Sequence, residues 1–290
     1  MKKAEADFHS IARHFENEPN EVYALSDLEA IWIEHGKEWN FPKKATVDSF
    51  VQALLDHGLR ELRLQSPHYS SILRYVWGNN APSISVAISI MRNGAYFSHA
   101  SAMWIHGLGG DEKNIFVNKE QAEKPRYSNT LSQEAIHRAF RRPQRRSQMF
   151  YEYLDTTITL LSGKHTGRLG VEVARAPSGH EVEVTSVERT LIDATVRPEY
   201  AGGVDSVLKA YRLAATRASL DKLSALLDQL DYIYPYRQSV GFYLEKAGYP
   251  DTDKLLTTAD TTRFDFYISH ALRDAEFDPK WRIFFPKTLK

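Results

Sequence analysis

The sequence contains no cysteine, and this absence excludes several kinds of site at once. Disulfide bonds, thiolate zinc sites, iron–sulfur clusters and a cysteine nucleophile all require a thiol group. Proline and glycine are also sparse, with 12 prolines and 15 glycines in 290 residues. Because 42% of the residues are apolar, we expect a chain that is folded throughout, without a long disordered tract.

Long apolar runs are missing as well. The segment from Met1 to Phe8 lacks the apolar stretch of a signal peptide, and no run approaches the roughly 20 apolar residues that a membrane span needs. We therefore expect a cytoplasmic protein with no membrane partner. The 37 basic and 37 acidic side chains give a formal net charge of zero, so any nucleic-acid surface has to be local.

The length of the chain favours two domains of ordinary size. Turn residues gather at positions 78–82, between an N-terminal pattern of helices and strands and a new helical pattern. We place the boundary there, with one domain over residues 1–80 and a larger mixed α/β domain over 81–290. The expected fold class is α+β.

The first helical patterns of the chain are amphipathic. Apolar side chains at three-and-four spacing predict a helix over residues 5–15. Ser26 followed by Glu29 is a capping-box signature that predicts the start of a second helix. Gly36 is expected near the end of that helix.

A third helix and a hairpin follow in the sequence. Thr46 is a good N-cap for an apolar stripe that runs to Leu55, and Gly58 is the residue expected just past the helix end. Strands are expected over residues 59–64 and 73–77. Three helices followed by a hairpin is the order of a winged helix-turn-helix, so we expect this fold in the N-terminal domain.

This N-terminal domain offers a possible DNA-binding surface. A helix fits the major groove of B-DNA and presents polar side chains to base edges, while neighbouring cations hold phosphates. The third helix and the hairpin supply both kinds of group, and the expected DNA-binding residues are Lys43, Lys44, Thr46, Ser49, Gln52, Arg60, Arg63 and Arg74. The alternative is a protein-interaction module in which these cations form a solvated surface.

The rest of the chain alternates between helical and strand patterns whose topology the sequence does not predict. Helices are expected over residues 83–92, 98–106, 185–194, 204–215, 219–230 and 238–247. Strands are expected over residues 114–117, 157–161, 169–174, 181–185, 263–268 and 281–285.

The densest basic run of the chain contains no acid. It consists of Arg138, Arg141, Arg142, Arg145 and Arg146. Because arginine binds phosphate and carboxylate groups in a bidentate manner, this loop is a candidate contact for nucleic acid or an acidic partner. The alternative is a solvated loop that pairs with acids of its own domain.

Other polar clusters favour structural roles. His99 and His106 share a helix face, but no third ligand is apparent, so we expect packing or capping and no metal. Glu181 and Glu183 alternate on a strand without the lysine that would complete a nuclease-like set. We expect no catalytic residue, no metal and no cofactor, and therefore not an enzyme.

One more polar cluster follows the last of these strands. Ser186 can cap a helix, and Arg189 and Asp193 lie four residues apart, where they can form an ion pair on one helix face. We interpret this cluster as structural, and the alternative is a role in holding a partner surface.

Three sequence motifs resemble the AbiEi family of antitoxins. The first motif is Tyr96-Phe97-Ser98-His99-Ala100-Ser101-Ala102 with Trp104-Ile105-His106-Gly107-Leu108. The second is Val184-Thr185-Ser186-Val187-Glu188-Arg189-Thr190-Leu191-Ile192-Asp193-Ala194, and the third is Arg197-Pro198-Glu199-Tyr200-Ala201-Gly202-Gly203. The resemblance extends over residues 83–256.

The resemblance implies a DNA-binding antitoxin of a type IV toxin–antitoxin system, associated with abortive infection against phage. Its N-terminal winged helix would repress its own operon, and its C-terminal domain would counteract a nucleotidyltransferase-type toxin, with or without a direct complex. The implied partner is duplex DNA of its own promoter, where a homodimer on inverted repeats is plausible on symmetry grounds. The alternative is a stand-alone regulator or protein-interaction module that docks a partner through the winged helix and the arginine loop.

Overall fold

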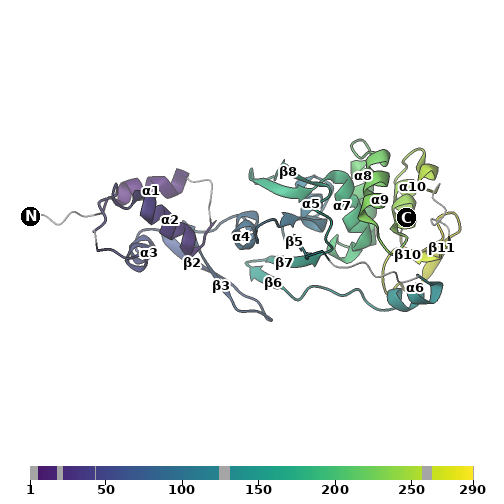
Figure 1. The fold of residues 1–290 in the computed structure, drawn as a ribbon, viewed down its shortest axis with the longest axis horizontal. Coiled ribbons are helices and arrows are strands. Elements are labelled where there is room, and N and C mark those ends of the chain that lie inside the picture. The colour runs from purple at the N-terminus through teal and green to yellow at the C-terminus, as the bar shows by residue number, and fades with distance from the viewer. Residues whose placement is uncertain (1–5, 18–21, 43, 124–130, 257–262, 290) are drawn as a thin grey trace, which may run out of the picture. The chain divides into compact units, whose positions relative to one another are not determined.

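The structure, a computed structural model, describes residues 6–17, 22–42, 44–123, 131–256 and 263–289. They belong to two compact units, coloured along the chain in Figure 1. The first unit comprises Met1–Met91 and Met149–Ile158, and the second comprises Arg92–Gln148 and Thr159–Lys290. The first unit therefore continues past the boundary expected at residue 80 and includes a later segment of the chain. Each unit contains helices and sheet, and the fold is α+β.

The first unit opens with helices α1 (Phe8–Asn17), α2 (Leu25–His35) and α3 (Val47–Leu55). They pack through an apolar core in which Ile11, Leu28 and Phe50 are fully buried. Helix α3 confirms its expected limits: Thr46 is the N-cap, and the chain leaves the helix through Gly58 with φ +128°.

The start of α2 differs from the expected capping box. The N-cap is Ala24, whose backbone N donates to the Asp27 carboxylate at 2.7 Å. The expected cap at Ser26 was wrong because Asp27 accepts from the backbone three residues earlier, at Ala24, so the helix starts at Leu25 and Ser26 lies in its first turn.

A small antiparallel sheet completes the first half of this unit, in the order β1-β3-β2. Strands β2 (Leu59–Leu64) and β3 (Ile72–Trp77) form the expected hairpin, and β1 (Val22–Tyr23), which was not expected, pairs with β3. Helix α4 (Ser83–Ile90) follows. The far end of the hairpin is bridged by the later segment, because Glu152 N donates to Gln65 O at 2.8 Å.

The second unit is built on a sheet whose strands follow the order β7-β5-β4-β9-β8. Their bounds are β4 (Tyr96–Phe97), β5 (Asn114–Glu120), β7 (Thr156–Gly163), β8 (Val171–Arg175) and β9 (Glu181–Thr185). Strand β6 (Phe150–Tyr153) precedes β7 and belongs to the first unit. The neighbours β4 and β9 are parallel, whereas β4–β5 and β8–β9 are antiparallel. Helix α5 (His99–Ile105) follows β4, and α7 (Val187–Val196) follows β9.

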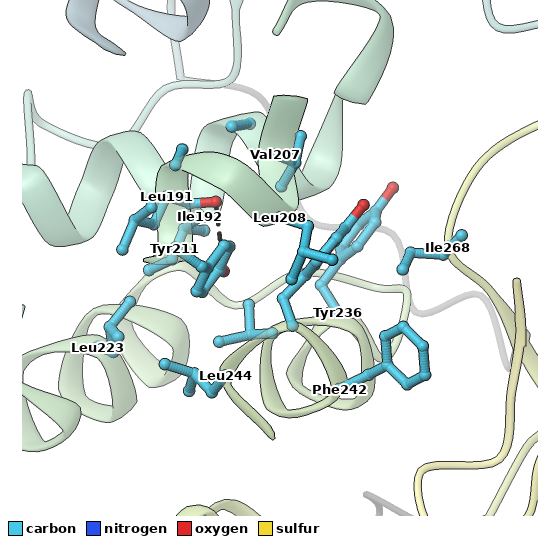
Figure 2. Close-up of a cluster of buried hydrophobic side chains, with 14 of the residues drawn as sticks. Leu191, Ile192, Val207, Leu208, Tyr211, Leu223, Tyr236, Phe242, Leu244 and Ile268 are labelled. Carbon is cyan, nitrogen blue, oxygen red and sulfur yellow. Dashed lines mark hydrogen bonds between the residues drawn. The ribbon is translucent and has the colours of Figure 1, made fainter. Parts of the chain in front are cut away.

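Further helices enclose the main core of the second unit (Figure 2). They are α6 (Gln133–Phe140), α8 (Val204–Ala214), α9 (Leu220–Leu230) and α10 (Tyr236–Lys246), with 3-10 turns at Pro198–Tyr200 and Thr252–Leu256. Figure 2 shows Leu191 of α7, Tyr211 of α8, Leu223 of α9 and Leu244 of α10 pointing toward one another. All four side chains are fully buried.

A second small sheet, in the order β10-β12-β11, lies at the C-terminal end of the sequence. Its strands are β10 (Phe266–Tyr267), β11 (Ala275–Asp278) and β12 (Ile283–Pro286). Just before β12, the buried Trp281 lies against Gly241 of α10, where a Cβ atom would overlap the indole ring. Within the described residues, no helix combines the length and the apolarity needed to cross a membrane.

Candidate functional site

The solvent face of α3 carries the polar side chains expected to contact DNA. Lys44, Thr46, Ser49 and Gln52 are all exposed. Lys43 lies outside the described residues. This face is therefore open within the part of the first unit that the structure describes.

Local hydrogen bonds already engage part of this face. The Ser49 hydroxyl donates to Thr46 O at 2.8 Å and accepts from Thr46 N at 2.9 Å, so it belongs to the helix cap. Gln52 Nε2 lies 3.4 Å from Asp56 Oδ1, a long hydrogen bond that costs little to exchange. Lys44 and Gln52 are thus the most available polar groups of this face, with the exposed acids Asp48 and Asp56 beside them.

The arginines of the hairpin have different surroundings. Arg60 is exposed on β2, and Arg63 is exposed and paired with Glu61 at 3.0 Å. Arg74 is half-buried, and its guanidinium donates to the carbonyl oxygens of Ser89 and Leu73 at 2.8–3.0 Å. Burial also lowers the pKa of Arg74, although the nearby Asp27 opposes this effect. Arg74 therefore ties the hairpin to α4 and is the least suited of the set to hold a phosphate.

The arginine run expected to form one surface is divided by the fold. Arg138 lies in the last turn of α6, and Arg141 and Arg142 follow directly, all with exposed side chains. Arg145 and Arg146 are also exposed but line a pocket of the second unit.

Backbone contacts fix the course of this arginine loop. His270 Nδ1 donates to Arg142 O at 3.1 Å, and Arg197 Nη1 donates to Arg145 O at 3.0 Å. Ser147 N donates to the Tyr200 hydroxyl at 2.7 Å. The loop thus has a defined path that leads Arg145 and Arg146 to the pocket.

The pocket has a volume of about 1150 Å³ and lies wholly within the second unit. Its walls come from β5, β7 and the turn after β7, from one side of α7, from the arginine loop and from the segment after α9. Its Lys and Arg side chains are Arg145, Arg146, Lys164, Arg189 and Arg197, against the carboxylates of Glu123, Asp193 and Asp231. The lining is therefore basic.

A buried ion pair lies on the α7 side of the pocket. Arg189 Nε donates to Asp193 Oδ1 at 2.8 Å, and the two side chains are only 5% and 8% exposed. Arg189 Nη1 donates to Leu169 O at 2.7 Å, so the guanidinium is held at two of its nitrogen atoms. Burial works against the charge of Arg189, but Asp193 outweighs it and raises the pKa above the ordinary value. This confirms the pair expected from sequence, as the Ser186 cap of α7 is also confirmed.

His99 occupies a strained position in the same pocket. It is the first residue of α5 and has φ +54°, a left-handed conformation that few residues with a side chain adopt. Its Nδ1 lies 2.8 Å from Ser98 Oγ, and its ring is perpendicular to that of Tyr200 at 5.5 Å. Burial lowers the pKa of His99 to about 4, and Arg197 and Arg189 add to this effect while Asp193 opposes it. The imidazole is therefore neutral at pH 7.

The rim of the pocket combines cations with flat side chains. The Arg197 guanidinium lies over the Tyr200 ring, 5.5 Å from its centroid. Lys164 Nζ donates to Leu230 O at 2.6 Å and to Asp231 O at 2.8 Å, which holds the turn after β7 against the end of α9. Tyr232 and Ile233 follow on this side, and Ile233 is 67% exposed.

The other candidates from sequence lie apart from one another. Glu181 and Glu183 are exposed on β9 and pair with Arg175 and Arg168, respectively. His106 is the C-cap residue of α5, as expected, and its Nε2 lies 2.6 Å from Thr185 O at the end of β9. Among the described residues, no group of three or more His, Cys, Asp or Glu side chains could hold a metal ion.

The three motifs of the sequence meet at this pocket, which sequence reasoning missed. His99 comes from the first motif, Arg189 and Asp193 from the second, and Arg197 and Tyr200 from the third. The buried arginine next to a carboxylate was interpreted only as a helix pair. The charged residues of the second and third motifs were visible in the sequence. Their position around one pocket was not.

Comparisons with known proteins give a fold and no family. No family model matches the sequence, and no curated protein matches it. Among solved structures, the chain is similar to the RV2827C protein from Mycobacterium tuberculosis, with 14% sequence identity and a TM-score of 0.61. The similarity covers 97% of this chain and 93% of that chain. At this identity the likeness shows a shared fold alone.

Proposed function

We propose that this chain is a DNA-binding antitoxin of the AbiEi kind, whose first unit is a winged helix-turn-helix that represses its own operon. Its second unit would counteract a nucleotidyltransferase-type toxin. The observation that carries the DNA-binding half is the order α1, α2, α3, hairpin, with an open polar face on α3. The motif resemblance supports the antitoxin half.

In this proposal α3 enters the major groove and the hairpin is the wing. Gln52 is the base-reading candidate, because its amide can pair with an adenine edge once it leaves Asp56. Lys44 and Arg60, both exposed, are the phosphate contacts. A homodimer would place two such helices on the halves of an inverted repeat.

A gel-shift titration with the DNA upstream of the gene tests this half. Lys44→Ala should weaken binding to every sequence and reduce the salt dependence by about one phosphate contact. Gln52→Ala should instead change the preference among sequences, by about 1–3 kcal/mol at the contacted base pair. Arg13→Ala, which removes an exposed cation from α1, is the matched control and should bind normally. Binding that is neither salt-sensitive nor sequence-preferring would refute the repressor function.

Co-expression with the product of the adjacent gene tests the antitoxin half. A nucleotidyltransferase whose toxicity is suppressed by the full chain is the expected result. Growth arrest that persists at equal expression would contradict it.

A direct complex is favoured by the three arginines outside the pocket. Arg138, Arg141 and Arg142 are exposed and form no ion pair with any described residue, so they are available to an acidic protein surface. Co-purification of the toxin that is lost in the Arg141→Ala/Arg142→Ala variant would support docking through this loop. Unchanged co-purification would exclude it.

A further inference from the structure

We propose that the basic pocket of the second unit is a binding site for a nucleotide, with the phosphates on the arginine side and the base on the side of Tyr232 and Ile233. This proposal does not depend on the DNA-binding surface proposed for the first unit. It is carried by the residues that line the pocket, and nothing in the comparisons assigns a ligand to it.

The charge of the lining favours a phosphate group. Asp193 is neutralised by Arg189, which leaves the side chains of Arg145, Arg146 and Arg197 as the main charges of one wall. Arginine is suited to phosphate because its planar group donates parallel hydrogen bonds to two oxygens. Arg146 also pairs with the exposed Glu199, a solvent-screened contact that a phosphate can replace.

The pocket also has a rigid basic floor. Arg189, which lines the pocket, is fixed by hydrogen bonds from Nε to the Asp193 carboxylate and from Nη1 to Leu169 O. A guanidinium held in place in this way loses little further side-chain entropy when a ligand binds beside it. The left-handed backbone of His99, next to this arginine in the pocket, is strain of the kind that accompanies ligand sites.

The size and the apolar side select a nucleotide over a simple anion. A volume of about 1150 Å³ lies just above the range of roughly 300–1,000 Å³ that is typical of small-molecule sites, and it is far more than one phosphate fills. Ile233 exposes an apolar side chain at the rim, and the neighbouring Tyr232 adds an aromatic residue to the same side of the lining. Nucleobases stack on aromatic rings and on guanidinium planes.

Isothermal titration of the full chain with ADP, adenosine and inorganic pyrophosphate tests the proposal. ADP should bind, adenosine should bind at least about tenfold more weakly because it lacks the phosphates, and pyrophosphate should be weaker than ADP because it lacks the base. No binding of ADP at millimolar concentration would overturn the proposal. If adenosine bound as tightly as ADP, the assigned phosphate contacts would be wrong. If pyrophosphate bound as tightly as ADP, the assigned contacts to the base would be wrong.

A matched pair of variants in one loop locates the site. Arg145→Ala/Arg146→Ala removes two charges from the pocket and should weaken ADP binding by about tenfold or more. Arg141→Ala/Arg142→Ala removes the same charge from the same loop outside the pocket and should leave ADP binding within about twofold. Equal losses in both variants would show that ADP is held by the general field of the loop, which would overturn the assignment. All four side chains are exposed, so both variants should fold.

Discussion

Replacing His99 by Asn should remove a defined part of the pH dependence of stability. His99 is 8% exposed and lies among Phe116, Tyr200 and the cations of the pocket. Asn is the matched substitution because it tolerates the left-handed backbone at φ +54° and does not titrate.

The size and sign of the effect follow from the pKa of His99. It falls from 6.5 in the unfolded chain to about 4 in the folded protein, mainly through burial. Between these values the unfolded chain binds a proton at this site and the folded protein does not. The contribution of His99 to stability is therefore fully present above pH 6.5 and is lost as the pH falls toward 4. At about 1.4 kcal/mol for each pKa unit, the loss is about 3 kcal/mol.

Urea unfolding at a series of pH values measures this loss. The free energy of unfolding of the native chain should fall relative to that of His99→Asn by about 3 kcal/mol between pH 7 and pH 4. Carboxylates titrate in both proteins and cancel in the difference. NMR titration of the His99 ring, assigned by its absence in the variant, should give a pKa near 4. Parallel stability curves, or a ring that titrates near 6.5, would refute the reasoning.

Two further substitutions test the core around the site. Arg189→Met should destabilise the chain by about 3–5 kcal/mol in urea unfolding, because it leaves the Asp193 carboxylate buried and unpaired. Most of this stability should be recovered in Arg189→Met/Asp193→Leu, and an equal loss in the double variant would contradict the ion-pair argument. Gly241→Ala should lower the free energy of unfolding by about 1–3 kcal/mol, because the added Cβ overlaps the Trp281 ring. A thermal melt should show a lower Tm that is partly restored by Trp281→Phe, and an unchanged Tm for Gly241→Ala would contradict the predicted overlap.

Local signals were sufficient for most elements of the fold. The expected limits of α3 and β9 match those observed. Thr46 and Gly58 mark the two ends of α3, and the alternating pattern of Glu181–Thr185 marks β9. Helix α6 was missed, since the sequence around Arg138 was interpreted as loop. Strand β1 was missed because two residues carry no periodicity.

The structure groups the residues expected for function differently from the sequence analysis. The arginine run was treated as one surface, but α6 ends at Phe140 and the loop then leads Arg145 and Arg146 away from Arg141. Arg74 was expected at a DNA surface, but its partner is the Ser89 carbonyl oxygen, fifteen residues further along the chain. Which backbone oxygen a side chain meets depends on tertiary packing, which the local pattern does not contain.

The convergence of the three motifs depends on one short pairing. Strand β4 is only two residues long, and Phe97 pairs in parallel with Val184 of β9. Because the strands are parallel, the helices that follow them begin at the same edge of the sheet, which brings His99 close to Arg189. A parallel pair needs a long connection, and its register leaves no mark on the intervening sequence. The pocket is therefore a product of this crossover, and a change that shifts the β4–β9 register would separate His99 from the ion pair while leaving every motif intact.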